Sequence, residues 1–320
     1  MIVVTGAAGF IGSCLIGKLN AENFNHIIAV DQFGDAQKEH NLKGKQLKKI
    51  ERDSFFEWLD EHFRHVEFIF HLGARTDTAE FDRELLHKLN TAYTQQVWKK
   101  CVAYQIPLVY ASSAATYGLS LEPSEDDEKN IKDLTPLNPY GESKQAFDLW
   151  ALAETEKPFY WAGLKFFNVY GPNEYHKSRM ASVVYHAFRQ ISKTGEMKLF
   201  RSHHPDFEDG HQQRDFIYVK DVVDVMYWLM RYRKNSGIYN LGTGQSNTFL
   251  GLTHAVFDAL EKPRKISFID TPEDIREKYQ YFTEAKMSKL RSIGYEEPFC
   301  NLEEGVRDYV RNYLKGSQYY

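Results

Sequence analysis

A glycine-rich turn near the start of the chain limits the folds open to it more than any other feature. Gly6, Gly9 and Gly12 form a G-x-x-G-x-x-G run between a strand-like apolar stretch, residues 2–4, and a helix-like segment, residues 10–20. Glycines at this spacing permit a tight turn, let a pyrophosphate approach the backbone and let helix and strand pack closely. The following helix N-terminus offers free N–H groups and a partial positive charge. The run therefore predicts a dinucleotide-binding turn, with contacts from Gly6, Gly9 and Gly12.

The first half of the chain alternates short apolar runs with amphipathic segments. Strands are expected at residues 27–30, 68–70, 107–111 and 162–167. Helices are expected at residues 53–63, 81–104 and 139–154. Strands that alternate with helices predict a parallel sheet covered on both faces, and apolar runs without polar alternation fit strands buried on both sides. We therefore expect an α/β fold, a Rossmann-type doubly wound parallel sheet.

After about residue 168 the segments become longer, more polar and less regular. We expect residues 1–168 to form the cofactor-binding Rossmann domain and residues 169–320 to form mainly a smaller C-terminal substrate-binding lobe. Within residues 214–245, strands near 216–219 and 238–241 are expected to return to the main sheet.

Composition excludes several classes of protein. The 320 residues are 42% hydrophobic and 26% charged, as in globular domains, and the net charge of −4 gives no support for nucleic-acid binding. The three cysteines, Cys14, Cys101 and Cys300, are scattered and odd in number, which fits a reducing compartment. No apolar run approaches the ~20 residues of a membrane helix, and no signal-peptide pattern is present. We expect a cytoplasmic protein that binds neither membrane nor metal, since the histidines lack metal-ligand spacing.

The choice between the two nicotinamide dinucleotides is left open by the residues themselves. Asp31 ends the second predicted strand, where a carboxylate can accept hydrogen bonds from a ribose hydroxyl, and this favours NAD. Lys38 and the lysines of residues 43–49 follow closely, and an ammonium group there could neutralise the 2′-phosphate of NADP.

Tyr140 and Lys144 form a Y-x-x-x-K pair on a predicted helix, and the spacing puts both side chains on one face. A phenol with a pKa of ~10 is a poor base at neutral pH, and a nearby ammonium lowers that pKa. Ser112 and Ser113 follow the fourth strand, at the sheet edge that carries sites in such folds. We expect Tyr140 to be a catalytic base, with Ser113 holding the substrate oxygen.

These motifs resemble those of the extended short-chain dehydrogenases/reductases. The matching stretches are the glycine turn and residues 110–118, 140–144, 166–172, 214–219 and 239–244. A narrower resemblance is to the ADP-glyceromanno-heptose 6-epimerases of lipopolysaccharide core biosynthesis. It is carried by residues 110–118, 176–182 and 278–283.

The narrower resemblance implies an epimerase that interconverts the D-glycero and L-glycero forms of ADP-β-D-manno-heptose by transient oxidation at carbon 6. Tyr140 and Lys177 would be two acid/base groups, with Ser113 assisting. NADP, rather than NAD, is the implied cofactor, and the implied assembly is a homo-oligomer, a homopentamer. The implied cofactor contacts are Phe10, Ile11, Asp31, Gln32, Lys38, Leu72, Gly73, Ala74, Arg75, Thr76, Asn90, Lys144, Val169 and Lys177. The implied substrate contacts are Ser113, Asn168, Arg179, His186, Phe200, Arg201, Ser202, His203, Arg214 and Tyr279.

Two stretches depart from the family pattern, and other functions share much of it. Residues 75–77 replace a small, Ser-rich stretch, and residues 204–213 lengthen a substrate loop. A UDP-hexose 4-epimerase would share the turn and the Tyr–Lys pair but leaves residues 176–182 unexplained. A 4,6-dehydratase needs an Asp-Glu pair where Ala114 and Ala115 stand. A non-catalytic NADP-sensing regulator could dispense with Tyr140 and Lys144.

Overall fold

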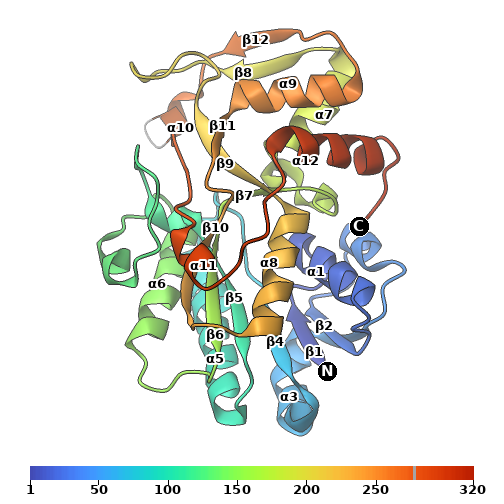
Figure 1. Cartoon of the computed structure of the whole chain (residues 1–320), viewed down its shortest axis with the longest axis vertical. Coiled ribbons are helices and arrows are strands. Elements are labelled where there is room, and N and C mark those ends of the chain that lie inside the picture. The colour runs from blue at the N-terminus through green and yellow to red at the C-terminus, as the bar shows by residue number, and fades with distance from the viewer. Residues whose placement is uncertain (277–278) are drawn as a thin grey trace.

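The centre of the molecule is a seven-stranded, fully parallel sheet, here taken from a computed structural model that describes residues 1–276 and 279–320 (Figure 1). Its strand order is β3-β2-β1-β4-β5-β6-β10. The bounds are β1 (Ile2–Thr5), β2 (Ile27–Asp31), β3 (Lys48–Glu51), β4 (Phe68–His71), β5 (Leu108–Ser113), β6 (Trp161–Phe166) and β10 (Gly237–Leu241). The chain reverses its direction across the sheet between β1 and β4, which makes this the switch point where doubly wound folds bind ligands.

Both faces of this sheet are covered by helices. On one face lie α1 (Phe10–Ala21) and α8 (Val219–Tyr232), and on the other α3 (Phe55–His62), α5 (Tyr93–Tyr104) and α6 (Pro139–Ala153). Ile2 and Val4 of β1 belong to the first core and Val3 belongs to the second. Because side chains alternate along a strand, a continuous apolar run is what a strand buried on both faces requires. The expected doubly wound parallel sheet is confirmed.

The second region of the chain lies at one end of the molecule, drawn at the top of Figure 1. Its strands are β7 (Asn168–Tyr170), β8 (Met197–Phe200), β9 (Gln213–Tyr218), β11 (Ser246–Thr248) and β12 (Ile266–Ile269), arranged as sheets β11-β9-β7 and β12-β8. Its helices are α7 (Val183–Thr194), α9 (Phe249–Leu260), α10 (Glu273–Arg276) and α12 (Leu302–Asp308), whereas α11 (Ser288–Ser292) lies beside β10 of the main sheet (Figure 1). One apolar cluster runs from β1 through α8 to Phe257 and Val306, so the two regions share a core.

Three expectations about individual elements need correction. Of the two strands expected to return to the main sheet, β10 does, but β9 pairs with β7 and β11. The helical stretch near residues 81–104 is divided into α4 (Arg83–Leu86), the π-helical turn His87–Ala92 and α5. The edge strand β3 was not expected, because its lysines suggest a solvated surface. In the structure, its backbone nevertheless forms a strand that pairs with β2 in parallel.

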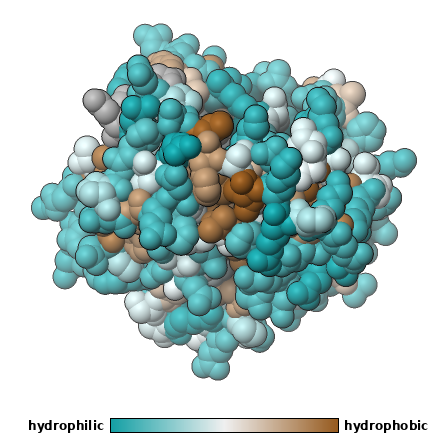
Figure 2. Space-filling view, turned by 90° about the horizontal axis from the view of Figure 1, so that it is seen from above, coloured by the Kyte–Doolittle hydropathy of each residue, from teal (hydrophilic) through white to brown (hydrophobic). Residues whose placement is uncertain are grey.

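The surface seen from above is mostly hydrophilic, with a group of apolar residues near the middle of this face (Figure 2). Within the described residues, no helix is long and apolar enough to cross a membrane. A group of three or more His, Cys, Asp or Glu side chains suited to a metal ion is likewise absent from residues 1–276 and 279–320.

Candidate active site

The glycine turn has the geometry of a phosphate cradle. Gly6 has φ +66°, and a Cβ there would lie 2.7 Å from the Gly73 nitrogen. A Cβ on Gly12 would lie 2.2 Å from the Gly6 carbonyl oxygen, so neither position tolerates another residue. Helix α1 follows Gly9 with no side-chain cap and no acidic residue in its first turn. Its first N–H groups therefore have no acceptor of their own and suit a bound anion.

Asp31 supports this turn through its carboxylate. One oxygen accepts a hydrogen bond from the Ala8 N–H at 2.9 Å, and the other accepts from the Gln32 N–H at 2.8 Å. Gln32 is exposed, and Lys38 on α2 (Ala36–Glu39) is half-buried and forms no ion pair among the described residues. Near the end of β2, the predicted cofactor residues therefore include the Asp31 carboxylate, which is already hydrogen-bonded to the backbone. They also include the Lys38 ammonium group, which has no ion pair among the described residues.

The loop after β4 is fixed by Asn90. The Arg75 N–H donates to the Asn90 side-chain oxygen at 2.8 Å, and the Asn90 amide donates back to the Arg75 carbonyl at 3.0 Å. The same amide lies 3.0 Å from the Ser143 hydroxyl on α6. The Gly73 N–H donates to the Thr5 hydroxyl at 3.1 Å. Asn90 thus connects the loop of Leu72, Gly73, Ala74, Arg75 and Thr76 to the helix of the Tyr–Lys pair.

Tyr140 lies in the first turn of α6. Pro139 opens the helix and Asn138 caps it by accepting a hydrogen bond from the Gly141 N–H at 2.8 Å. Tyr140 and Ser113 are both buried near the carboxyl end of β5, and the Ser113 side chain lies beside the phenol. Lys144 is buried one helical turn on, and its Nζ donates to the Ala111 carbonyl at 2.9 Å.

The pKa of Tyr140 differs from the sequence expectation. Burial raises the pKa of Tyr140 above its usual value of 10.0, and the neighbouring Ser113 side chain only partly opposes the rise. Burial also lowers the pKa of Lys144 to about 8, with Asp148 acting in the opposite direction. The expected lowering of the phenol pKa by Lys144 is therefore wrong for the protein alone. The cause is that both groups are desolvated and the ammonium is bound to a backbone carbonyl.

Lys177 lies on the segment Tyr175–Met180, which we call the Lys177 segment. Its Nζ lies 5.4 Å from the centre of the Phe10 ring on the glycine turn. Burial lowers the pKa of Lys177, and the nearby Glu174 opposes the shift. Two predicted site residues that are distant in the sequence are thus in contact. Val169, another predicted cofactor residue, is half-buried in β7.

Arg214, a predicted substrate residue, is buried between two aromatic rings. Its guanidinium carbon lies 5.6 Å from the ring centres of both Phe249 and Tyr279. It donates to the backbone carbonyls of Gln213, at 2.8 Å, and Gln280. Burial lowers its pKa to about 10, and among the described side chains no carboxylate pairs with it. A buried guanidinium without a counter-ion suits an anionic ligand such as a diphosphate.

The other predicted substrate residues lie on several different elements. Phe200 contacts Tyr279 with ring centres 6.3 Å apart, and the His203 N–H donates to the Tyr281 hydroxyl at 3.0 Å. Arg201 and Ser202 lie between them, with the Ser202 N–H bound to Asp209 at 2.8 Å. Asn168 is exposed at the start of β7. His186 lies 3.4 Å from the Arg179 carbonyl, beside the Lys177 segment. Lys278, one residue of the resemblance, lies outside the described residues.

Sequence patterns missed two asparagines that connect the site. Asn41 donates to the carbonyls of Ala8, at 2.9 Å, and Asn173, at 3.1 Å. Asn173 donates to the Ser13 hydroxyl at 2.9 Å and the Tyr320 carbonyl at 3.1 Å, and accepts from the Tyr320 N–H at 2.9 Å. No local pattern signals such contacts, because the partners are far apart in the chain.

A fully buried polar network behind Ser113 was also missed. Lys165 Nζ lies 2.8 Å from an Asp148 oxygen, which also accepts from the Ser112 hydroxyl at 2.6 Å. The Tyr110 hydroxyl donates to the other Asp148 oxygen at 3.0 Å. Asp148 follows Lys144 by four residues on α6, so helical spacing could have identified it as part of the same face.

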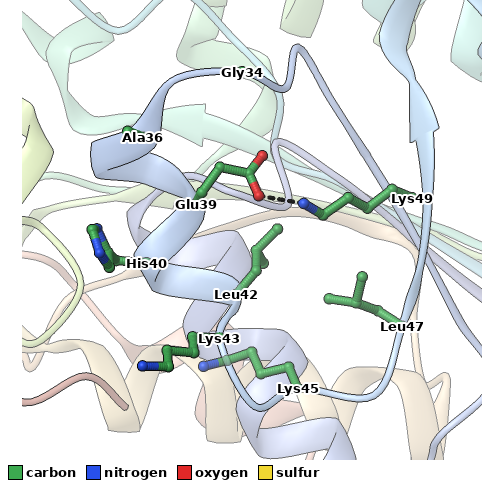
Figure 3. A pocket seen from close by; sticks show the side chains of 9 residues that line it. All are labelled: Gly34, Ala36, Glu39, His40, Leu42, Lys43, Lys45, Leu47 and Lys49. Carbon is green, nitrogen blue, oxygen red and sulfur yellow. Dashed lines mark hydrogen bonds and ion pairs between the residues drawn. The ribbon is translucent and has the colours of Figure 1, made fainter.

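A cavity of about 710 Å³ is lined by residues between Gly34 and Lys49 (Figure 3). Glu39 and Lys49 form an ion pair across it, while Lys43 and Lys45 lie at its other end. Lys45 donates to the Tyr320 carbonyl. None of the residues implied by the family resemblance lines this cavity. Three lysines considered above for the 2′-phosphate do line it, Lys43, Lys45 and Lys49, and two of these ammonium groups already have partners.

Comparisons with known proteins agree with the geometry. Residues 2–242 match the model of the NAD dependent epimerase/dehydratase family. The chain is 46% identical to the ADP-L-glycero-D-manno-heptose-6-epimerase of Fusobacterium nucleatum and 45% identical to that of Nitratidesulfovibrio vulgaris, each over 98% of both chains. The solved structure of the Helicobacter pylori enzyme of that name superposes with a TM-score of 0.82 at 28% identity, covering 97% of this chain and 95% of the other.

These matches confirm the family expected from the motifs, and they make the protein an epimerase that works with a nicotinamide dinucleotide. The chain therefore belongs to the NAD dependent epimerase/dehydratase family and, within it, to the ADP-L-glycero-D-manno-heptose-6-epimerases.

Proposed function

We propose that this protein interconverts ADP-D-glycero-β-D-manno-heptose and ADP-L-glycero-β-D-manno-heptose, with NADP as its resident cofactor. The relatives that cover nearly the whole chain carry the name of this activity. The observation that best supports it is the contact of Lys177 with Phe10 on the glycine turn. Through this contact, Lys177 lies beside the glycine turn as a second candidate acid/base group, on a different element from Tyr140.

The chain's own residues fit a dinucleotide. The cradle of Gly6 and Gly12 and the uncapped start of α1 suit a pyrophosphate, and the loop held by Asn90 follows β4 at the switch point. When bound, the cofactor supplies a hydride acceptor with a positive charge and returns the same hydride. Lys144 is placed on the helix face of Tyr140 to hold a ribose hydroxyl.

The preference for NADP rests on Asp31 and Lys38. The Asp31 carboxylate already accepts backbone hydrogen bonds from Ala8 and Gln32, so part of its charge is compensated. Lys38 has no ion pair among the described residues and can bind a 2′-phosphate, with the exposed Gln32 beside it. A carboxylate committed to the turn and an available ammonium favour NADP over NAD.

The proposed reaction needs two acid/base groups because the stereocentre is outside the sugar ring. One group, Tyr140 or Lys177, removes the hydroxyl proton at carbon 6 while hydride leaves that carbon. Rotation about the bond between carbons 5 and 6 then presents the other face of the keto group. The second group donates a proton to the oxygen as hydride returns, so no net oxidation results. Ser113 holds the oxygen beside Tyr140.

The substrate residues are proposed to bind the nucleotide diphosphate and the heptose. Arg214 would pair with the diphosphate, since its guanidinium is buried without a carboxylate among the described side chains. Asn168, Arg179, His186, Tyr279 and the segment of residues 200–203 would contact the rest of the sugar nucleotide. On this proposal residues 1–168 mainly hold the cofactor and residues 169–320 mainly hold the substrate.

The family membership supports two further proposals, a cytoplasmic location in lipopolysaccharide core biosynthesis and a homopentameric assembly. Light scattering coupled to size-exclusion chromatography measures the assembly directly, and a monomeric mass would contradict this part of the proposal.

The activity is tested by incubating the protein with ADP-D-glycero-β-D-manno-heptose and resolving the two epimers by chromatography. Conversion to a mixture of both epimers is expected, together with release of NADP on denaturation, identified by mass spectrometry. Tyr140→Phe and Lys177→Met should each lose most of the activity. Interconversion of UDP-glucose and UDP-galactose without any action on the heptose would instead support the 4-epimerase alternative.

A further inference from the structure

An ion pair links the Lys177 segment to the loop after β4. Arg179 Nη2 lies 3.2 and 3.3 Å from the two carboxylate oxygens of Asp77. Arg75 approaches the same carboxylate at 3.8 Å and pairs with Glu80 at 3.1 Å. The Asp77 side chain is 23% exposed, less than either arginine, and its carboxylate is shared by both. Two segments that are about one hundred residues apart in the chain are thereby held together.

The backbone between Lys177 and Arg179 is bent in an unusual way. Ser178 has φ +50° and ψ −124°, outside the helical region and in the half of backbone space that favours glycine. Because of this bend, the side chains of the two neighbouring residues extend in different directions: Lys177 lies over Phe10, and Arg179 reaches Asp77. A strained bend persists only when contacts on both sides fix it.

Few other side-chain contacts hold this segment on the side of the β4 loop. The Thr78 hydroxyl lies 3.9 Å from the Met180 sulfur, a weak contact. On the opposite side Glu174, buried, accepts from the Ser182 hydroxyl at 2.7 Å and anchors the segment to α7. Among the described residues, the Asp77–Arg179 ion pair is therefore the charged contact that joins this segment to the loop after β4.

We propose that Asp77 is a positioning residue for Lys177. Through Arg179 it holds the Lys177 segment against the loop that follows β4, so that the bend at Ser178 is maintained and the ammonium group stays over the glycine turn. The inference rests on the proposed function, because it assigns Lys177 the second acid/base role. Asp77 itself contacts Arg179 and Arg75 and is assigned no contact with substrate or cofactor.

Asp77→Asn removes the charge with little change in shape, and Asp77→Glu keeps it. We expect Asp77→Asn to lower kcat about tenfold with KM within about twofold, since misplaced catalytic groups lose rate rather than binding. Asp77→Glu should recover most of the rate. Arg179→Gln should lower kcat similarly and should also raise KM, because Arg179 is proposed to contact the substrate. The kcat of the double variant should be no lower than that of the poorer single variant.

The pH profile provides a readout that a purely structural role would not move. In the wild type, burial lowers the pKa of Lys177, and the titratable groups next to it are Glu174 and His176. Release of the segment exposes the ammonium to water, so the limb of the kcat profile that reports Lys177 should move to higher pH in Asp77→Asn. The limb should stay in place in Asp258→Asn, which removes an exposed ion pair with Arg264 near the end of α9.

Amide hydrogen exchange of residues 175–181 separates this inference from the proposed function. Faster exchange in Asp77→Asn than in Asp258→Asn supports the positioning role even if the wild type fails to epimerise the heptose. An active wild type combined with unchanged kcat, pH profile and exchange in Asp77→Asn would overturn the inference alone. Multiplicative losses in the double variant would also overturn it, because the two residues would then act separately.

Discussion

Two buried cations, one in each region of the molecule, have opposite surroundings. Lys165, under the sheet edge that carries Ser113, is fully buried and pairs with the equally buried Asp148. Arg214, in the second region, is buried between Phe249 and Tyr279 and has no carboxylate partner among the described side chains. A buried charge that pairs with a counter-ion inside the protein needs no ligand to stabilise it. A buried charge without a counter-ion is stabilised by a ligand of opposite charge. The difference supports a structural role for Lys165 and the proposed binding role of Arg214.

The largest effect is expected from breaking the complete pair. Asp148→Asn leaves the Lys165 ammonium buried without a counter-ion and should cost about 3–5 kcal/mol of unfolding free energy. Denaturant unfolding measures it, and the double replacement Asp148→Leu with Lys165→Met should recover most of the loss. Wild-type stability in Asp148→Asn would show that the buried pair does not have the structural role assigned to it.

Arg214 should show the reverse behaviour. Arg214→Met removes a buried charge that lacks a partner, so the unfolding midpoint should stay level or rise. The KM for the sugar nucleotide should increase by an amount equivalent to about 2 kcal/mol, the contribution of a charged hydrogen bond. Arg214→Lys should bind with intermediate strength because it loses the two-point contact. A destabilised Arg214→Met with normal KM would place Arg214 in the same class as Lys165.

His71 represents a third case, a buried group kept neutral. Its ring nitrogens lie 2.7 Å from the Thr5 hydroxyl and 2.9 Å from the Thr94 hydroxyl, and burial lowers its pKa to about 3. Below the usual value of 6.5 the unfolded chain binds a proton that the folded chain does not, so stability falls with falling pH. The loss from His71 should reach about 2 kcal/mol between pH 6.5 and 5. It should be absent in His71→Gln, measured by urea unfolding across this range.

The smallest effect concerns an unpaired cation at the surface. Lys38→Ala should weaken NADP binding about fivefold, within the range of exposed charge pairs, and leave NAD binding unchanged. Lys43→Ala, a neighbouring exposed lysine that lines the outer cavity, is the matched control. Equal losses for NAD and NADP would show that Lys38 does not contact the 2′-phosphate.

Features that depend on short-range patterns were predictable from the sequence. The turn of Gly6 and Gly12 needs only local geometry, and the apolar runs of β1 and β4 follow from burial on both faces. The Tyr140–Lys144 spacing requires only a helix. The position of β9 was not predictable, because an apolar strand pattern fits the main sheet and the smaller sheet equally well.

Features that depend on long-range contacts or on solvation were missed. Asn41 and Asn173 acquire their roles only when segments distant in the chain meet. The pKa of Tyr140 was assigned in the wrong direction, because helical spacing reports which groups are near but not that both are desolvated. The strand β3 was missed because an edge strand with lysines on its outer face resembles a loop in sequence.

The hydrogen bonds between Asn173 and Tyr320 have a consequence for biosynthesis. Every strand of the parallel sheet comes from residues 2–241, so that sheet can assemble while later residues are still on the ribosome. The loop that leads into Lys177 lacks its partner until Tyr320 has emerged. A nascent chain would therefore fold its cofactor cradle before the loop that leads into its proposed second base gains these hydrogen bonds.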